Sequence, residues 1–209
     1  IFNGQTINLT YNSTSGKWEA TVTAPSKSSY SQTDHVLGGT VKATDVAGNT
    51  TTVDQSHATL GSSLKIRVKE KVAPVISITA LTADSYITNA TPTIKFTVTD
   101  ADSGVNSGTI AMKLDGTAVT VTKTAITGGY ECSYKPTTAL KDGSHTISVT
   151  ASDNDGNAAS AKTATFTVDT VPPTLSITAP AEGLVSNKTT ITVTGKTDDA
   201  TSKPVIWAV

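Results

Sequence analysis

A stretch of about a dozen residues occurs twice in this chain, at a spacing that matches one small β domain. Residues 39–49 read GTVKATDVAGN, and residues 145–157 read HTISVTASDNDGN. Each copy leads to a proline-containing junction, after which residues 76–80 read ISITA and residues 175–179 read LSITA. A separation of roughly 100 residues is the length of one two-sheet β domain. The repetition therefore predicts a tandem array of similar β domains.

The stretch between the two junctions has the alternating pattern of short β-strands. Apolar and polar residues alternate with a period of two, and no stretch shows helical periodicity of useful length. The dipeptide at residues 115–116, Asp-Gly, is a strong signal for a hairpin. We expect about seven strands, at residues 75–80, 93–99, 109–114 and 119–123 and around Cys132, Val149 and Phe166. The predicted fold class is all-β, with immunoglobulin-like β-sandwiches in tandem.

The repeat divides the chain into one complete and two incomplete units. We expect residues 71–169 to form a complete immunoglobulin-like repeat. Residues 1–70 are expected to form a repeat that lacks its first strands, and residues 170–209 the N-terminal strands of a third repeat. Residues 1–7 align with residues 113–119, at the third strand of the complete repeat. The alignment then matches Trp18, Ala20 and Val22 with Tyr130, Cys132 and Tyr134.

Neither terminal unit can bury a core by itself, because a sandwich needs both of its sheets. Two explanations fit this pattern. The sequence is a window in a longer array, which we expect because a partial array is the simpler account. Alternatively, the terminal pieces complete one another between molecules, as donor strands do.

Composition excludes several classes of partner. The net charge of −1 and the pI near 6.3 provide no basic field, so we expect no nucleic-acid partner. No apolar run approaches the ~20 residues of a membrane span, so we expect no membrane insertion within this segment. The single cysteine excludes an internal disulfide, so stability has to come from packing, with or without a metal. These features predict an extracellular protein, on a bacterial cell surface or a phage virion.

The repeat resembles the bacterial immunoglobulin-like (Big) tandem domains of surface adhesins and of phage tail and virion proteins. Residues 43–49 (ATDVAGN), 151–157 (ASDNDGN) and 168–173 (VDTVPP) carry the resemblance, which extends over the whole chain. It implies a spacer or display module, stiffened in some members by Ca²⁺ at the domain joints. The partners implied are adjacent repeats of the same longer chain, other fibre or virion subunits, and a host-surface glycan or protein.

Acidic residues gather in the loops that meet at each predicted joint. In such a sandwich, the loops after the second strand and before the last strand lie at the pole nearest the preceding domain. The candidate calcium ligands at the first joint are Glu70, Asp100, Asp102, Asp153, Asp155 and Asn157. Those at the second joint are Asp169, Asp198 and Asp199. Ca²⁺ requires several converging oxygen ligands, and carboxylates without a cation would repel one another.

A second interpretation of the same residues needs no metal. Asp and Asn side chains cap tight turns through their own backbone, and Asp-x-x-Gly-Asn makes a good turn. Lys69 and Lys71 flank Glu70 and could neutralise part of its charge. The segment that starts at Asp153 is not an EF-hand loop, because Gly156 comes too early and no glutamate follows at the twelfth position.

No grouping of catalytic residues stands out, so we expect no enzymatic activity. Cys132 is predicted to be a small core residue, because it lies on the inward face of its strand. His35, His57 and His145 lack the spacing of metal ligands and are predicted to be surface residues.

Three functions compete. The leading prediction is a non-catalytic structural spacer of an extracellular bacterial surface or phage tail fibre protein. One alternative is a carbohydrate- or protein-binding adhesin module, and another is an accessory module of a secreted polysaccharide-degrading enzyme. Aromatic residues favour such binding, but they form only 5% of the chain, and Trp18 and Trp207 are predicted to anchor cores. Tyr30 and Tyr86 are the exposed candidates for binding.

Overall fold

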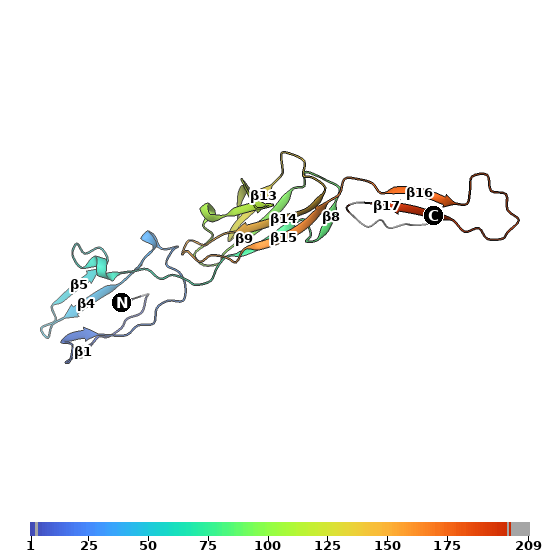
Figure 1. Ribbon diagram of the computed structural model, residues 1–209. Coiled ribbons are helices and arrows are strands. Elements are labelled where there is room, and N and C mark those ends of the chain that lie inside the picture. The colour runs from blue at the N-terminus through green and yellow to red at the C-terminus, as the bar shows by residue number, and fades with distance from the viewer. Residues whose placement is uncertain (3, 200, 202–209) are drawn as a thin grey trace.

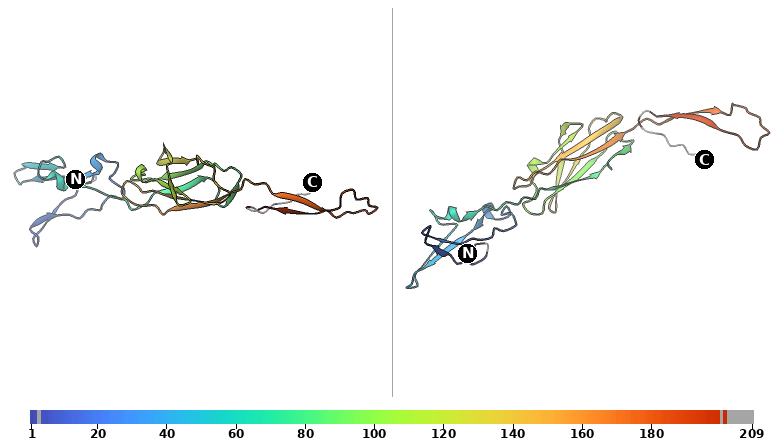
Figure 2. Two further views of the ribbon diagram at one scale, coloured as in Figure 1. Left: turned by 45° about the horizontal axis from the view of Figure 1, so that its top comes forward. Right: turned by 60° about the horizontal axis from the view of Figure 1, so that its bottom comes forward.

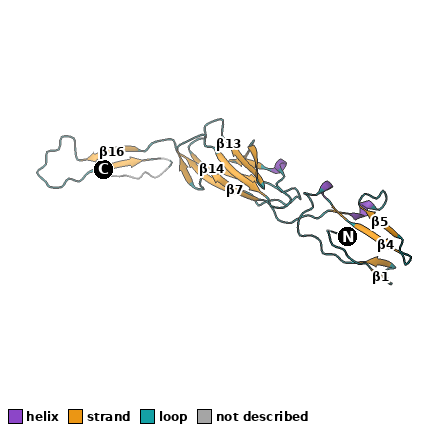
Figure 3. Cartoon of the chain, turned by 180° about the vertical axis from the view of Figure 1, so that it is seen from behind, coloured by secondary structure: helices purple, strands orange, loops and turns teal. Residues whose placement is uncertain are grey.

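The structure is a computed structural model, and it describes residues 1–2, 4–199 and 201. Strands dominate these residues, and the helices among them are short 3₁₀ turns: η1 (Thr33–His35), η2 (Gly61–Leu64) and η3 (Ser107–Thr109). Figure 3 shows these turns in purple among the orange strands. No helix in this described part of the chain has the length and apolar character of a membrane span. The predicted all-β fold is confirmed.

Two sheets between residues 75 and 168 face each other and form a β-sandwich. The first sheet has the strand order β12 (Thr122–Ile126), β13 (Gly129–Tyr134), β9 (Ile94–Thr99) and β7 (Val75–Ala80). The second has the order β11 (Thr117–Val119), β10 (Ala111–Leu114), β14 (Gly143–Thr150), β15 (Lys162–Val168) and β8 (Ser85–Ile87). Neighbouring strands are antiparallel except β15 and β8, which are parallel. This arrangement is the immunoglobulin-like sandwich that the sequence predicts.

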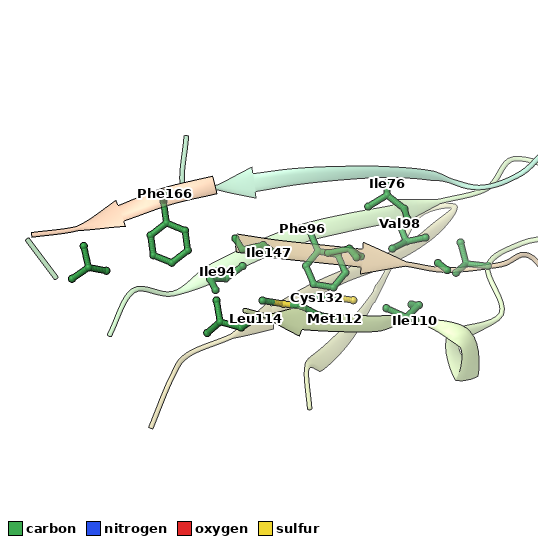
Figure 4. Close-up of a cluster of buried hydrophobic side chains, with 14 residues drawn as sticks. Ile76, Ile94, Phe96, Val98, Ile110, Met112, Leu114, Cys132, Ile147 and Phe166 are labelled. Carbon is green, nitrogen blue, oxygen red and sulfur yellow. The ribbon is translucent and has the colours of Figure 1, made fainter. Parts of the chain in front are cut away.

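The core lies between the two sheets and is built by alternate residues of the strands. On β9, the side chains of Ile94, Phe96 and Val98 are fully buried, whereas Lys95 between them is exposed. Figure 4 shows Phe96 next to Cys132, with side chains from both sheets pointing into the same space. Cys132 is therefore a core residue, as predicted.

The strand predicted at residues 119–123 is divided in the structure. Its beginning belongs to β11 and its end to β12, and these two strands lie in different sheets. The chain crosses between the sheets at residues 120–121, a change of partner that side-chain alternation does not reveal. The short strand β8 was also not predicted, because three residues are too few for a periodic signal.

The residues before the sandwich form three separate two-stranded sheets. These pair β1 (Thr10–Asn12) with β2 (Lys17–Glu19), β3 (Leu37–Gly38) with β6 (Lys65–Ile66), and β4 (Thr40–Thr44) with β5 (Thr50–Asp54). The prediction that Trp18 anchors a core is wrong, because its side chain is 66% exposed and contacts the ring of Tyr11. Trp18 lines an open groove together with Val41 of β4 and Ile66 of β6, so these sheets do not pack closely against it.

The residues after the sandwich form one strand pair, β16 (Thr174–Ala179) and β17 (Thr194–Asp198). Leu175 of β16 pairs with Thr197 of β17, and at the equivalent positions Ile76 of β7 pairs with Val98 of β9. In both strand pairs the register shifts two residues after this pair. The strand pair therefore has the register of the first two long strands of the sandwich. Trp207 lies outside the described residues.

The three parts follow one another along the molecule. Figure 1 shows the sandwich in the middle, with β1–β5 on one side of it and β16 and β17 on the other. Both views of Figure 2 agree that these strands lie at opposite ends. The division of the chain into repeats at residues 1–70, 71–169 and 170–209 is a proposal that fits this arrangement.

Candidate metal centre at the first joint

Three buried carboxylates converge where the N-terminal part meets the sandwich. Glu70 comes from the linker before β7, Asp100 follows β9, and Asp153 lies in the loop between β14 and β15. One oxygen of each lies within 4.8 Å of one oxygen of each of the others. Their side chains are buried, with exposures of 8%, 9% and 1% respectively. Among the described residues, three such ligands converge only here.

The spacing of these oxygens suits a calcium ion. Oxygen ligands lie about 2.3–2.6 Å from Ca²⁺, so two ligands on opposite sides of the ion are roughly 5 Å apart. Burying three like charges is costly unless a cation or hydrogen bonds compensate them. In the described part of the chain, the ion pairs are Lys95–Glu131 and His145–Asp115, and neither reaches this cluster.

Backbone N–H groups provide part of the compensation. The N–H of Ser103 donates to Oε1 of Glu70 at 2.7 Å, and the N–H of Gly104 donates to Oδ1 of Asp100 at 2.7 Å. Oδ1 of Asp153 accepts from the backbone of residue 157, also at 2.7 Å. Each carboxylate can accept about four hydrogen bonds or metal contacts, so these bonds leave capacity for an ion.

The other acidic residues predicted at this joint have a different role. Oδ2 of Asp102 accepts from the N–H of Ser28 at 3.0 Å, and Oδ2 of Asp155 accepts from the N–H of Glu70 at 3.0 Å. Nζ of Lys69 donates to the backbone oxygen of Asp155 at 3.0 Å and so does not pair with a carboxylate of the cluster. These bonds hold the N-terminal part and the linker against the loops of the sandwich.

Asn157 joins the linker to the cluster. Its Nδ2 donates to Oδ2 of Asp153 at 2.6 Å and to the backbone oxygen of Glu70 at 3.2 Å. The structure therefore brings Glu70, Asp100 and Asp153 together as candidate ligands, while Asn157 positions two of them.

The earlier copy of this loop forms the same turn without a buried cluster. Oδ1 of Asp45 accepts from the N–H of Asn49 and its Oδ2 accepts from the Asn49 side chain, both at 2.8 Å. Asp45 is exposed, and the hydrogen bonds from the side chain and backbone of Asn49 lower the pKa of its carboxyl group. Turn chemistry alone therefore explains Asp45, whereas the turn at Asp153 also faces Glu70 and Asp100.

The second joint has two aspartates at positions equivalent to Glu70 and Asp100. Asp169 is buried in the linker after β15, and its Oδ1 accepts from the N–H of Val171 at 3.3 Å. Asp199 directly follows β17, as Asp100 follows β9, and it accepts from the N–H of Thr201 at 2.9 Å. Asp198 is the last residue of β17 and is exposed.

Sequence reasoning missed Asp142, which fastens the second linker. Its Oδ1 accepts from the N–H of Thr170 at 3.1 Å and from the Thr170 hydroxyl at 2.9 Å. Asp142 lies in a bend before β14 and Thr170 in the linker after β15, and no pattern in the sequence indicates that they meet.

The prediction that His145 is a surface residue is wrong. Its side chain is buried against the ring of Phe166, with Nδ1 2.7 Å from Oδ2 of Asp115 and Nε2 2.8 Å from the backbone oxygen of Lys141. Burial alone lowers the pKa of His145, but the bonds and charge attraction to Asp115 and the bond to Lys141 together raise it. The signal was available, because His145 lies on the same inward face of β14 as Ile147.

The exposed aromatic candidates differ from each other. Tyr86 is exposed on β8, as predicted. Tyr30 is half-buried, and its ring stacks on His35 with centroids 4.1 Å apart.

Comparison with known families agrees with the observed fold. Residues 73–170 match the family described as "Bacterial Ig-like domain", and residues 173–207 match "Glucodextranase, domain B". The sandwich is therefore a bacterial immunoglobulin-like domain, and this segment of the chain belongs to that family. A comparison of the chain with curated proteins gave no match.

Solved structures with partial likeness cover less than half of the chain. CopC from Methylosinus trichosporium OB3b has 16% identity and a TM-score of 0.35, over 46% of this chain and 94% of its own. The fibronectin(III)-like modules of Clostridium thermocellum CbhA have 26% identity and a TM-score of 0.34, over 45% and 96%. The endo-beta-1,4-mannanase from Thermotoga petrophila has 15% identity and a TM-score of 0.37, over 46% and 19%. These low TM-scores carry no argument about function.

Proposed function

We propose that this chain is a non-catalytic spacer segment of an extracellular bacterial protein and that Ca²⁺ stiffens its first joint. The observation that carries the proposal is the convergence of Glu70, Asp100 and Asp153 from the linker and two loops of the sandwich. An ion held by these three residues would fix the linker relative to both loops. In this proposal the protein lies on a bacterial cell surface or in a phage virion, where the segment displays or supports an adhesive domain.

The joint already restricts motion before an ion is added. Hydrogen bonds join Ser28 to Asp102, and others join Lys69 and Glu70 to Asp155 across the same boundary. Short linkers with several such contacts limit the angle between domains. An ion would add to this restriction, because moving the linker would break its coordination. The partners of such a spacer are adjacent repeats, other fibre subunits, and a host glycan or protein presented to its displayed part.

Thermal denaturation of the chain in dilute solution, with added calcium or with a chelator, tests calcium binding by the sandwich. A ligand at about 100 times its dissociation constant adds about 2.7 kcal/mol of stability, so melting should shift upward by several degrees. Asp153→Asn is expected to remove the shift. Asp45→Asn is the matched control, since Asp45 makes the same turn bonds outside the cluster. If a chelator changes neither the melting temperature nor the molecular length measured by small-angle scattering, the calcium proposal is wrong.

The absence of catalysis is part of the proposal. The thiol of Cys132 is buried in the core, and this burial raises its pKa, so it is a poor nucleophile. The acidic residues that converge do so at the joint, and their backbone partners hold them there. A turnover activity that is lost on substitution of any residue within 71–169 would contradict this.

A second candidate function is that of an accessory module in a secreted polysaccharide-degrading enzyme. The match of residues 173–207 to glucodextranase domain B favours it. A panel of polysaccharides in affinity electrophoresis tests whether the chain itself binds sugar, with Tyr86→Ala as the variant and Tyr134→Ala in the sandwich as control. Retardation that depends on Tyr86 would support this candidate over the spacer.

A further inference from the structure

The segment that joins the N-terminal part to the sandwich carries a basic residue at every second position. Residues 65–71 read KIRVKEK, and we call Lys65, Arg67, Lys69 and Lys71 the basic row. All four side chains are exposed. The chain has 16 lysines and arginines, so a quarter of them lie in this short segment, which Figure 1 shows passing into the sandwich. The net charge of −1 therefore hides a local concentration of positive charge.

Backbone contacts hold this segment extended. Ile66 belongs to β6, which pairs with β3. The N–H of Val68 donates to the hydroxyl group of Ser29, and the carbonyl oxygen of Val68 accepts from the N–H of Ser29. Both backbone groups of Glu70 bond to the loop between β14 and β15. Binding at every second residue is the period of a strand, so the basic row lies along one side and spans about 20 Å at about 3.3 Å per residue.

The other side of the segment faces the protein. Ile66 is 41% exposed, Val68 is half-buried, and Glu70 is buried. Oε1 of Glu70 accepts from the N–H of Ser103, so its charge is directed into the first joint. The alternation therefore separates the acidic residue of the segment from its four basic residues.

The basic row is not neutralised by an ion pair in the described part of the chain. The ion pairs there, Lys95–Glu131 and His145–Asp115, lie within the sandwich. Nζ of Lys69 donates to the backbone oxygen of Asp155, and an ammonium group has two further N–H donors. A polyanion that binds such a row releases its own condensed counter-ions, and this release favours binding.

The surroundings of the basic row select the kind of polyanion. Residues 64–72 contain no aromatic side chain, whereas proteins that bind single-stranded nucleic acid combine basic grooves with aromatic platforms for the bases. A membrane-surface segment needs an apolar face that enters the lipid, but Val68 and Glu70 are bound to protein here. Lysine supplies three of the four charges, and it binds phosphate as a point charge. These features fit a flexible chain of phosphodiester groups that carries no bases.

We propose that the basic row binds a linear polyol-phosphate polymer, in which phosphodiester groups alternate with short polyols. The setting rests on the proposed function, because a spacer on a bacterial surface would lie among the anionic polymers of that surface. The extended backbone is fixed before binding, which lowers the entropic cost of ordering it. Binding fastens the spacer to the surrounding polymer at its first joint.

Isothermal titration calorimetry of the 209-residue chain with lipid-free poly(glycerol phosphate) tests the proposal. Each phosphate contact with a single-stranded chain contributes about −0.7 to the slope of log K against log salt, so four contacts predict a slope of about −2.8. The association constant is then expected to fall about fiftyfold between about 50 and 200 mM salt. Absence of binding at about 50 mM salt, or binding that does not depend on salt, overturns the proposal.

Single substitutions test whether the basic row is the site. Arg67→Gln and Lys71→Gln each remove one contact, so each is expected to weaken binding about fivefold at about 0.1 M salt and to reduce the slope by about 0.7. Lys113→Gln and Lys162→Gln are matched controls, because they remove exposed lysines of the sandwich. Both controls are expected to bind like the unmodified chain. An equal loss in all four variants overturns the assignment to the basic row.

Three other polyanions test the identity of the partner. Oligothymidylate, heparin and phosphatidylglycerol vesicles, at equal concentrations of charge, are each expected to bind more weakly than poly(glycerol phosphate). Tighter binding of any of them overturns the proposal and indicates a nucleic acid, a sulfated glycan or a membrane instead.

A chelator in every titration separates this inference from the calcium proposal. Without calcium, no ion can bridge the polymer to the carboxylates of the first joint. Polymer binding by the basic row is expected to persist under these conditions. Its absence overturns this inference alone, whereas calcium-dependent melting of the chain is a separate readout for the ion.

Discussion

His145 shows how a polar residue can belong to a core. Both of its ring nitrogens face acceptors, a carboxylate oxygen of Asp115 and the backbone oxygen of Lys141. An imidazole ring satisfies two acceptors at once only when both nitrogens carry protons. The ring also stacks on Phe166, so its orientation is fixed by packing as well as by hydrogen bonds. The geometry therefore favours the charged form of His145 inside the folded sandwich.

Stability of the sandwich is expected to fall as pH rises through the pKa of His145. The folded-state pKa is raised above the ordinary value of 6.5, so the stabilisation is fully present below 6.5 and is lost above the raised value. Thermal denaturation across this range measures the effect, and His145→Gln should flatten the profile. His57→Gln, at an exposed position, is the control that should keep the original profile. An equal pH dependence in both variants would contradict the prediction.

The pairing of β13 with β9 depends on a close approach of the two backbones. Gly129, at the start of β13, lies so close to β9 that an added Cβ would be 2.0 Å from the backbone oxygen of Val98. Backbone cannot move away as a flexible side chain can. The Gly128–Gly129 pair therefore serves both the turn before β13 and the approach of this strand to β9.

Gly129→Ala is expected to destabilise the sandwich by about 1–3 kcal/mol, because overpacking forces the backbone to shift. Thr124→Ala, at an exposed position of the neighbouring strand β12, is expected to change stability by less than about 0.5 kcal/mol. Denaturant unfolding compares the two variants. Equal stabilities would show that β13 and β9 can separate locally at no cost.

The whole molecule is a row of parts whose joints control its shape. At the first joint, Asp102 accepts from Ser28 of the N-terminal part, and Asp155 accepts from Glu70 of the linker beside the carboxylate cluster. At the second joint, Asp142 accepts hydrogen bonds from the backbone N–H and from the hydroxyl group of Thr170. For the proposed spacer, the length and stiffness of the row decide where its ends can reach.

Asp142→Ala is expected to widen the range of angles at the second joint, because it removes the acceptor of both Thr170 bonds. Small-angle scattering should show a shorter average length. Asp84→Ala, whose partner Thr165 lies within the sandwich, is the control. The same length in both variants would show that Asp142 does not stiffen the joint.

Sequence by itself determined the repetition, the all-β class and the inward face of each long strand. Spacing and alternation are local patterns, and the backbone geometry of a strand converts them directly into buried and exposed faces. The turn at Asp153 was also visible, because Asp and Asn bind their own backbone within a few residues. These conclusions need no knowledge of what lies across the sheet.

Tertiary structure alone decided which acidic side chains face one another. Glu70, Asp100 and Asp153 converge, whereas Asp102 and Asp155 accept from the backbone of a neighbouring segment. No sequence pattern separates these two roles, because they depend on where loops far apart in the chain meet. The exposure of Trp18 was decided in the same way, since burial of an inward face requires a second sheet to pack closely against it, whereas Trp18 lines an open groove.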